Sequence, residues 1–208
     1  MNNKKNLKIY KIKHGETEWN LSEKIQGHLD SPITENGIKK LKETGKKLEN
    51  IVFEEVYTSY MERTIKTAEI IVSINKNEKI KGNKIKLKKL HELNEINFGV
   101  WQGMTHEEIF KKYPKEGYNY FNNIKKYKAS SIGGEDLQEG LERFLKGLKK
   151  IIKNNENGNV LVVTHGTVLE LFLNYIENKK IDDLDERKLV GNGEYKIFVF
   201  EDDNFNER

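Results

Sequence analysis

The amino-acid sequence predicts an α/β fold of three αβα layers, in which a mostly parallel central sheet carries helices on both faces. The first observation is that strand patterns alternate with amphipathic helix patterns along the chain, as parallel sheets require. The second is that two expected strands, residues 7–13 and 159–164, each end in a His-Gly pair. At 208 residues the chain is long enough for one well-buried core, so residues 1–208 are expected to form one domain.

The composition limits the class of protein. Charged residues make up 34% of the chain, and the formal net charge is +4. The lysines are scattered among glutamates, and the lysine run over residues 76–89 has no interleaved aromatics, so no nucleic-acid partner is expected. No apolar run is long enough for a membrane span, and the first residues lack a signal-peptide pattern. With cysteine absent as well, these features indicate a cytoplasmic protein without a membrane partner.

After the first strand, the chain is expected to run through a loop, a helix and a second strand. Residues 16–33 show no apolar periodicity, and loops of this length are often functional. Thr34 is a favourable N-cap residue and precedes a helical pattern that reaches about residue 50. A short strand is predicted over residues 55–58.

Ser59 and Glu62 match a capping box, in which a hydroxyl residue is followed three positions later by glutamate. The match predicts that Ser59 caps a helix that continues through residue 74. It also places Arg63 in the first turn of this helix, close to the carboxyl end of the preceding strand. Arg63 is therefore expected on the same rim as the two His-Gly pairs.

The second half of the chain continues the alternation. Residues 84–90 alternate apolar side chains with lysine and are predicted to form a strand. Thr105 and Glu108 form another capping box, and Pro114 limits the helix that they open. The remaining expected elements are a short helix over residues 118–127, a turn over 130–136, a strongly amphipathic helix over 137–152, a helix over 168–176 and a closing strand over 195–201.

The two His-Gly pairs predict a common pocket. In open α/β sheets the crevice outside the carboxyl ends of the strands is where ligands bind, so His14 and His165 are expected to face each other there. Two helix-capping imidazoles on one rim are the structural alternative. His28 and His106 follow no such strand, and we expect them to be structural residues.

Two other kinds of site fit less well. A metal site could draw on both pocket histidines and on Glu92 or Glu95, but His106 begins an HExxH pattern that Phe110 interrupts, and no metal is predicted. A Ser-His-Asp hydrolase is weaker still, because the chain has no GxSxG elbow.

The charges on the rim favour an anionic ligand. Lys13, Arg63, two imidazoles and glycine-rich backbone at helix starts suit a dianion, and phosphate is the commonest one. Cationic neighbours lower the pKa of an imidazole and keep it neutral, which leaves it able to act as a nucleophile at pH 7. A nearby protonated carboxyl group could then protonate the leaving oxygen.

Six motifs follow one another along almost the whole chain: KHGETEWN (13–20), IQGHLDSPITENG (25–37), TSYMERTIKTAE (58–69), NEINFGVWQG (94–103), GGED (133–136) and VTHG (163–166). With these motifs the sequence resembles the histidine phosphatase superfamily, in its phosphoglycerate mutase-like branch. The motifs stand in the order of the family, and six in register make chance an implausible explanation.

The resemblance implies a role for each matching residue. His14 would be the nucleophile that forms a phosphohistidine, and Glu95 would be the proton donor. Arg63, His165 and Lys13 would hold the equatorial phosphate oxygens. No metal and no cofactor are implied. Further contacts to the phosphate or the rest of the substrate are implied for Asn20, Gln26, Gly27, Gly166 and Thr167.

The sequence departs from the family pattern at two lysines. The family has arginine at the position of Lys13, and lysine keeps the charge but loses the planar fork that holds two phosphate oxygens. Either lysine has replaced the arginine and reduced activity persists, which we favour, or the chain only binds phosphorylated ligands. Lys11 stands where the family has an apolar residue in a central strand, and we expect its ammonium to extend to water or toward the pocket.

The length of the chain favours hydrolysis over phosphoryl return. In the family that the sequence resembles, the mutases are longer chains with a basic insertion over the pocket. Here only residues 105–133 fill that place. An open pocket admits water to the phosphohistidine, so a phosphatase acting on a small phosphorylated metabolite is expected first. A phosphoglycerate mutase is second, and a phospho-ligand binding protein is third. The sequence leaves open the substrate and whether the chain forms a homodimer.

Overall fold

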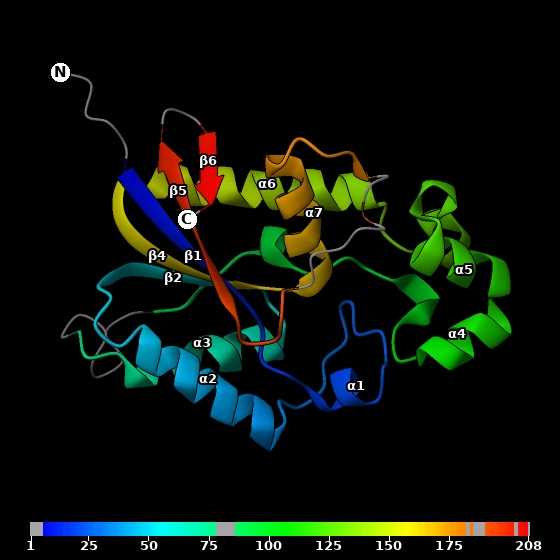
Figure 1. The fold of residues 1–208 in the computed structure, drawn as a ribbon, viewed down its shortest axis with the longest axis horizontal. Coiled ribbons are helices and arrows are strands. Elements are labelled where there is room, and N and C mark those ends of the chain that lie inside the picture. Colours follow the sequence, from blue (N-terminus) through cyan, green and yellow to red (C-terminus); the bar gives the residue numbers. More distant parts are fainter. Residues whose placement is uncertain (1–5, 78–85, 182–183, 185–189, 202–203, 208) are drawn as a thin grey trace.

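The computed structural model describes residues 6–77, 86–181, 184, 190–201 and 204–207. Its centre is a six-stranded sheet with the order β3-β2-β4-β1-β5-β6 (Figure 1). The first four strands in this order are parallel, and β5 and β6 are antiparallel to their neighbours. The strands are β1 (Asn6–Lys13), β2 (Phe53–Thr58), β3 (Lys88–Lys89), β4 (Asn157–Thr164), β5 (Tyr195–Glu201) and β6 (Asn204–Glu207).

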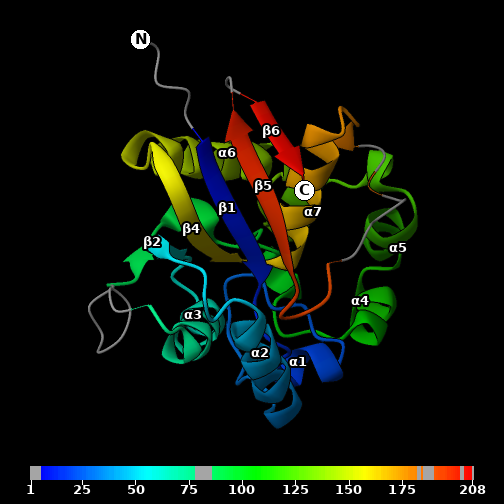
Figure 2. The same cartoon turned by 60° about the vertical axis from the view of Figure 1, so that its left-hand side comes forward.

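Helices cover both faces of the sheet, so the predicted three-layer αβα class is confirmed. Figures 1 and 2 show α2 and α3 on one side and α6 and α7 on the other. No helix in the described part of the chain is both long and apolar enough to cross a membrane. The helices are α1 (Glu18–Leu21), α2 (Glu35–Lys47), α3 (Glu62–Ile74), α4 (His106–Lys112), α5 (Pro114–Asn122), α6 (Leu137–Asn154) and α7 (Gly166–Ile176), and short 3₁₀ turns span His91–Leu93, Gly99–Trp101, Ile124–Lys126 and Ala129–Ile132.

The register of β1 and β4 explains how the two histidines meet. The strands are parallel neighbours, and Lys13 is paired with Thr164 at the end of the ladder. His14 and His165 are the next residues of the two strands, so both leave the sheet at its carboxyl edge. Side chains of β1 alternate between the two apolar cores, with Leu7 and Ile9 toward α6 and α7. Burial on both faces fixes this register.

Lys11 lies in the apolar core, which contradicts the expectation that its ammonium reaches water or the pocket. The side chain is fully buried, and Nζ has no hydrogen-bond partner among the described residues. Four phenylalanine rings surround Nζ, and their negatively polarised faces attract a cation. The distances from Nζ to the ring centroids are 3.0 Å for Phe172, 4.4 Å for Phe198, 5.1 Å for Phe205 and 5.6 Å for Phe144.

Two of the three predicted N-caps are confirmed. Thr34 Oγ1 accepts the Gly37 N–H at 2.8 Å, and Thr105 forms a complete capping box with Glu108. The Ser59 cap is wrong, because α3 begins at Glu62 with Met61 as its N-cap. The hydroxyl of Ser59 instead contacts the Met61 N–H, the Thr64 hydroxyl and His165 Nε2.

The other differences concern element boundaries. Within the described residues, the strand expected over 84–90 is confined to Lys88–Lys89, while positions 84 and 85 lie outside them. The helix expected over 118–127 begins earlier as α5, because Pro114 occupies the first helical position, where its missing N–H costs nothing. The long loop over 16–33 contains α1, and β6 was not predicted.

Candidate active site

A pocket of about 380 Å³ opens at the carboxyl ends of β1 and β4. It is bordered by the starts of α3 and α7, by the loop after β1 and by α4 and α5. Its floor carries cationic and imidazole groups, and its mouth carries aromatic and mixed charged groups. The lining residues are Lys13, His14, Trp19, Asn20, Glu23, Lys24, Ile25, Gln26, Gly27, Arg63, Glu95, Phe98, His106, Tyr120, Gly166, Thr167 and Glu170.

His14 presents an unprotonated nitrogen to the pocket. Its Nδ1 lies 2.8 Å from the carbonyl oxygen of Gly15, and a carbonyl can only accept, so Nδ1 carries the proton. Nε2 therefore keeps its lone pair. Burial lowers the pKa of the ring well below 6.5, and the nearby charge of Arg63 lowers it further. The side chain is thus fixed as the neutral tautomer that nucleophilic attack requires.

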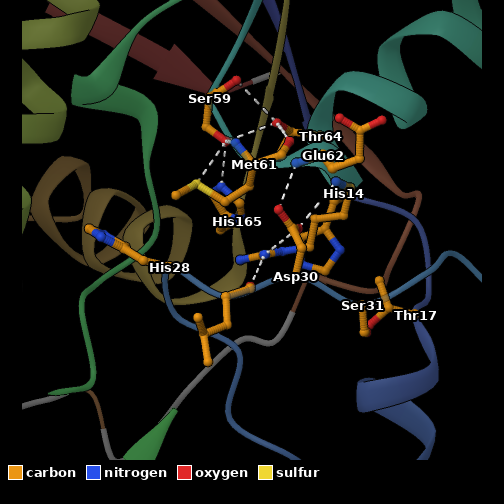
Figure 3. Close-up of polar contacts among 12 residues, drawn as sticks. His14, Thr17, His28, Asp30, Ser31, Ser59, Met61, Glu62, Thr64 and His165 are labelled. Atoms are coloured by element: carbon orange, nitrogen blue, oxygen red, sulfur yellow. Dashed lines mark hydrogen bonds and ion pairs between the residues drawn. The ribbon is translucent and has the colours of Figure 1, made fainter. Parts of the chain in front are cut away.

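His165 lies directly behind His14, with ring centroids 5.4 Å apart. It is fully buried, and burial followed by the charge of Arg63 lowers its pKa well below 6.5. Nε2 is hydrogen-bonded to Ser59 Oγ at 2.8 Å (Figure 3), while Nδ1 has no partner in the described part of the chain. Ser59 Oγ also accepts the Met61 N–H and lies 2.8 Å from Thr64 Oγ1. The structure thus brings the two predicted histidines together but places His165 outside the pocket lining.

Arg63 is buried at the start of α3 with one edge of its guanidinium free. Nη1 donates to the Leu29 carbonyl at 2.6 Å and to Asp30 Oδ1 at 2.7 Å. Nη2 donates to the Gly27 carbonyl at 2.7 Å. A guanidinium has five N–H groups, so the Nε–H and one Nη2–H stay available for a ligand. Nε is buried and has no partner among the described residues, which fits a bidentate contact to an anion.

Lys13 reaches over the start of α7. The position that a Cβ would take at Gly166 lies 3.4 Å from Lys13 Cε and 3.5 Å from Lys13 Nζ, so the end of the lysine side chain lies against the first residue of α7. Burial lowers the pKa of Lys13, and the carboxylates of Glu170, Glu95 and Glu194 oppose that shift. The lysine therefore brings a point charge to the pocket floor.

Glu95 is held by the first turn of α7. One carboxylate oxygen accepts the Thr167 N–H at 3.0 Å, and the other accepts the N–H groups of Val168 at 3.1 Å and Ile96 at 3.0 Å. A carboxylate is well placed there, because the positive end of the helix dipole favours it. The Thr167 N–H, implied as a phosphate contact, is committed to Glu95 in this structure.

Arg143 fixes the segment that carries Glu95, and sequence reasoning assigned it no role. The guanidinium donates to Glu135 through Nε at 2.7 Å and through Nη2 at 2.8 Å, which explains the Glu of the GGED motif. Nη2 also donates to the Glu95 carbonyl at 3.1 Å. Nη1 donates to the carbonyls of Glu92 and Asn94.

The remaining predicted contacts lie at the pocket wall. Asn20 Oδ1 accepts the Thr17 N–H at 3.0 Å, so its amide nitrogen is turned away from that N–H. Gly27 has a φ of +54°, and a Cβ there would lie 2.3 Å from Gln102 Oε1, so glycine is required. Gln26 is buried, and its Oε1 has no partner in the described residues.

The other histidines take different places. His28 Nε2 lies 2.9 Å from the Glu95 carbonyl oxygen, which ties the loop after β1 to the Glu95 segment. His106 lines the mouth of the pocket. In the part of the chain that the structure describes, no cluster of three or more histidine, aspartate or glutamate side chains is arranged to hold a metal ion.

The family model of the histidine phosphatase superfamily, branch 1, matches residues 9–208. The uncharacterized phosphatase PhoE of Bacillus subtilis is 32% identical over 165 residues, covering 79% of this chain and 75% of that protein. A 2,3-bisphosphoglycerate-dependent phosphoglycerate mutase of Buchnera aphidicola is 30% identical over 230 residues, covering 96% of each. The solved structure of YhfR from Bacillus stearothermophilus matches with a TM-score of 0.88 and 29% identity, covering 97% of this chain and 95% of that one. The chain belongs to the histidine phosphatase superfamily.

Proposed function

We propose that the chain is a phosphomonoesterase that hydrolyses a small phosphorylated metabolite through a phosphohistidine on His14. The observation that carries the proposal is the Nδ1 contact to the Gly15 carbonyl, 2.8 Å long, which leaves Nε2 as a free nucleophile at the pocket floor. Phosphoryl transfer needs mainly positioning and charge stabilisation. The free edge of Arg63 and the ammonium of Lys13 supply both.

The two half-reactions follow from this arrangement. His14 Nε2 attacks phosphorus in line, and a P–N bond forms. The P–O bond to the leaving group breaks as Glu95, which takes up a proton when the substrate binds, gives that proton to the leaving oxygen. Water then attacks the phosphohistidine, the carboxylate of Glu95 takes a proton from the water, and inorganic phosphate leaves. Because its pKa is lowered well below 6.5, His14 stays neutral in the free enzyme, so protonation of this ring should not reduce kcat/KM as the pH is lowered through 6.5.

The charge of the pocket mouth favours hydrolysis over mutase activity. The segment over residues 105–133 contributes His106 and Tyr120 to the pocket lining but, in this fully described segment, no lysine. The cations that line the pocket are Lys13, Lys24 and Arg63. A mutase must retain a second anionic group while the phosphoryl group returns, and a segment that places no lysine in the pocket lining does little to retain it.

A simple assay tests the proposal. Para-nitrophenyl phosphate is offered to the wild type and to His14→Ala in the presence of EDTA, and the proposal expects turnover by the wild type only. His91→Ala is the matched control, because His91 stacks on Tyr60 outside the pocket. Activity retained by His14→Ala would reject the nucleophile, and no activity in the wild type toward any phosphate ester would favour a binding protein.

A second assay separates hydrolysis from isomerisation. The wild type is incubated with 3-phosphoglycerate, with and without 2,3-bisphosphoglycerate, and both inorganic phosphate and 2-phosphoglycerate are followed. The proposal expects phosphate release that does not depend on the bisphosphate. Formation of 2-phosphoglycerate that requires the bisphosphate would favour the mutase. Parallel assays with phosphoserine, a sugar phosphate and α-ribazole 5′-phosphate then rank the substrates by kcat/KM.

A further inference from the structure

The loop over residues 191–194, which precedes β5, is attached to the backbone of the proposed nucleophile. The Gly193 N–H donates to the carbonyls of Lys13 at 3.0 Å and His14 at 3.2 Å. The Lys13 N–H in turn donates to the Glu194 carbonyl at 3.3 Å. Thr44 Oγ1 donates to the Gly193 carbonyl at 2.8 Å, which anchors the loop to α2. The loop is therefore a fixed support beneath His14.

Asn192 uses its side-chain amide to connect two groups of the site. Its Nδ2 donates to the His14 carbonyl at 3.1 Å and to Asn20 Oδ1 at 3.2 Å. An amide nitrogen has two hydrogens, so these bonds use both of them. Asn192 is not among the residues that line the pocket, and it acts from behind the pocket wall.

These contacts decide which end of the Asn20 amide meets a ligand. Asn20 Oδ1 accepts from Asn192 Nδ2, from the Thr17 N–H at 3.0 Å and from the Thr17 hydroxyl at 3.1 Å. A flipped amide would place its NH₂ against the two N–H donors, which is unfavourable. Asn20 lines the pocket, and its Nδ2 donates to no other described protein group, so it presents two N–H donors to an anion.

We propose that Asn192 is a positioning residue for phosphate binding: it locks Asn20 with its amide nitrogen toward the phosphate and braces the carbonyl of His14. The inference rests on the proposed function, because it assumes a phosphoryl group in this pocket. It extends that function to a residue more than 170 positions from His14 in the sequence.

The Asn192→Asp variant is the sharpest test. Aspartate has nearly the shape of asparagine, but its carboxylate only accepts, so it would face two oxygen atoms that it cannot bind. Asn20 Oδ1 would then lose its Asn192 donor and face a carboxylate oxygen, which favours the flipped amide that only Thr17 still opposes. Asn192→Ala removes the donors without creating this repulsion, and its effect should be smaller.

The experiment measures the Kd of inorganic phosphate by calorimetry and kcat/KM with para-nitrophenyl phosphate. The single variants are Asn192→Asp, Asn192→Ala and Asn20→Ala. The double mutants combine each Asn192 substitution with Asn20→Ala. We expect Asn192→Asp to raise the Kd of phosphate and to lower kcat/KM, each by about 10- to 100-fold, as is common when a supporting partner of a site residue is lost. In the Asn20→Ala background, the same substitution should change the Kd and kcat/KM by less than about threefold. Asn159→Asp is the control, since Asn159 donates to the Val52 carbonyl outside the pocket.

The double-mutant cycle also separates a positioning role from a structural one. If Asn192→Asp changes the Kd and kcat/KM by the same factor in the wild type and in Asn20→Ala, it does not act through Asn20, and the inference is overturned. If Asn192→Asp fails to fold, the cycle with Asn192→Ala gives the same test. A wild type that binds phosphate but never turns over a phosphate ester would reject the proposed function, while the Kd values still decide the role of Asn192. A wild type that does not bind phosphate would reject both.

Discussion

Ser59 Oγ lies 2.8 Å from Nε2 of His165, although 106 residues separate the two in the sequence. Both side chains are fully buried, and Nδ1 of the same ring has no partner among the described residues. A buried ring that is held through one nitrogen keeps its orientation only while that hydrogen bond lasts. Ser59 therefore sets the orientation of the second histidine.

Ser59→Ala should lower kcat/KM by about 10- to 100-fold, because His165 would lose the partner that fixes its ring. Steady-state kinetics with para-nitrophenyl phosphate measure this effect. Unchanged kinetics in a folded variant would show that Ser59 only fills space.

Lys13→Arg should raise kcat/KM, because a guanidinium can hold two phosphate oxygens where an ammonium holds one point. Lys13→Ala should lower kcat by about 10²- to 10³-fold, as the loss of one transition-state donor does. Lys66→Arg and Lys66→Ala are the matched controls, since Lys66 pairs with Glu62 and Glu69 on the exposed side of α3. An inert Lys13→Ala would mean that this side chain does not touch the phosphate.

Glu95→Gln should lower kcat most for substrates with poor leaving groups. An alkyl phosphate, which needs a proton on its leaving oxygen, should lose about 10²- to 10⁴-fold in kcat, and a phenolic phosphate much less. The amide also removes one acceptor from the Thr167 N–H or the Val168 N–H, so thermal unfolding must be followed in parallel. Equal kinetic losses on both substrates would argue against proton donation.

Lys11→Met should raise the free energy of unfolding at pH 7 by about 1 to 4 kcal/mol, the range found when buried charged groups are replaced by apolar ones. Burial lowers the pKa of Lys11 well below 10.5 in the folded state, so the unfolded chain binds the proton more tightly. Wild-type stability therefore rises with pH toward 10.5, and the advantage of methionine shrinks. Urea unfolding at pH 7 and pH 9.5 measures this difference. Lys66→Met is the surface control, and a Lys11→Met variant less stable than wild type at pH 7 would show that the phenylalanine faces favour the cation.

Patterns that are local in sequence predicted the frame of this fold well. A strand that ends in His-Gly can be recognised from a few consecutive residues, and β1 and β4 are where the pattern places them. The Ser59 pattern misled because a serine followed three positions later by glutamate satisfies the capping rule in any chain. In the fold, that hydroxyl contacts the nearby Met61 N–H and Thr64 hydroxyl and also His165, 106 positions away. A pattern within a few residues cannot show the contact to His165.

The supporting residues were harder to foresee, because each acts through a tertiary contact. The signal for Arg143 was the rarity of arginine: the 37 basic residues comprise 33 lysines and four arginines. Arg63 and Arg143 each hold several oxygen atoms with one planar group, which lysine cannot do. Asn192 gave no comparable signal, since an asparagine between two glycines is typical of an ordinary turn.

The most direct test of the account is to trap the intermediate. Wild-type protein is mixed with ³²P-labelled substrate, quenched in alkali and digested, and the labelled peptide is identified by mass spectrometry. If His14 is the nucleophile, an acid-labile, alkali-stable phosphoryl group appears on the peptide that contains His14 and is absent from His14→Ala. A wild type that turns over substrate but yields a label on another residue, or no label under rapid quench, would contradict it.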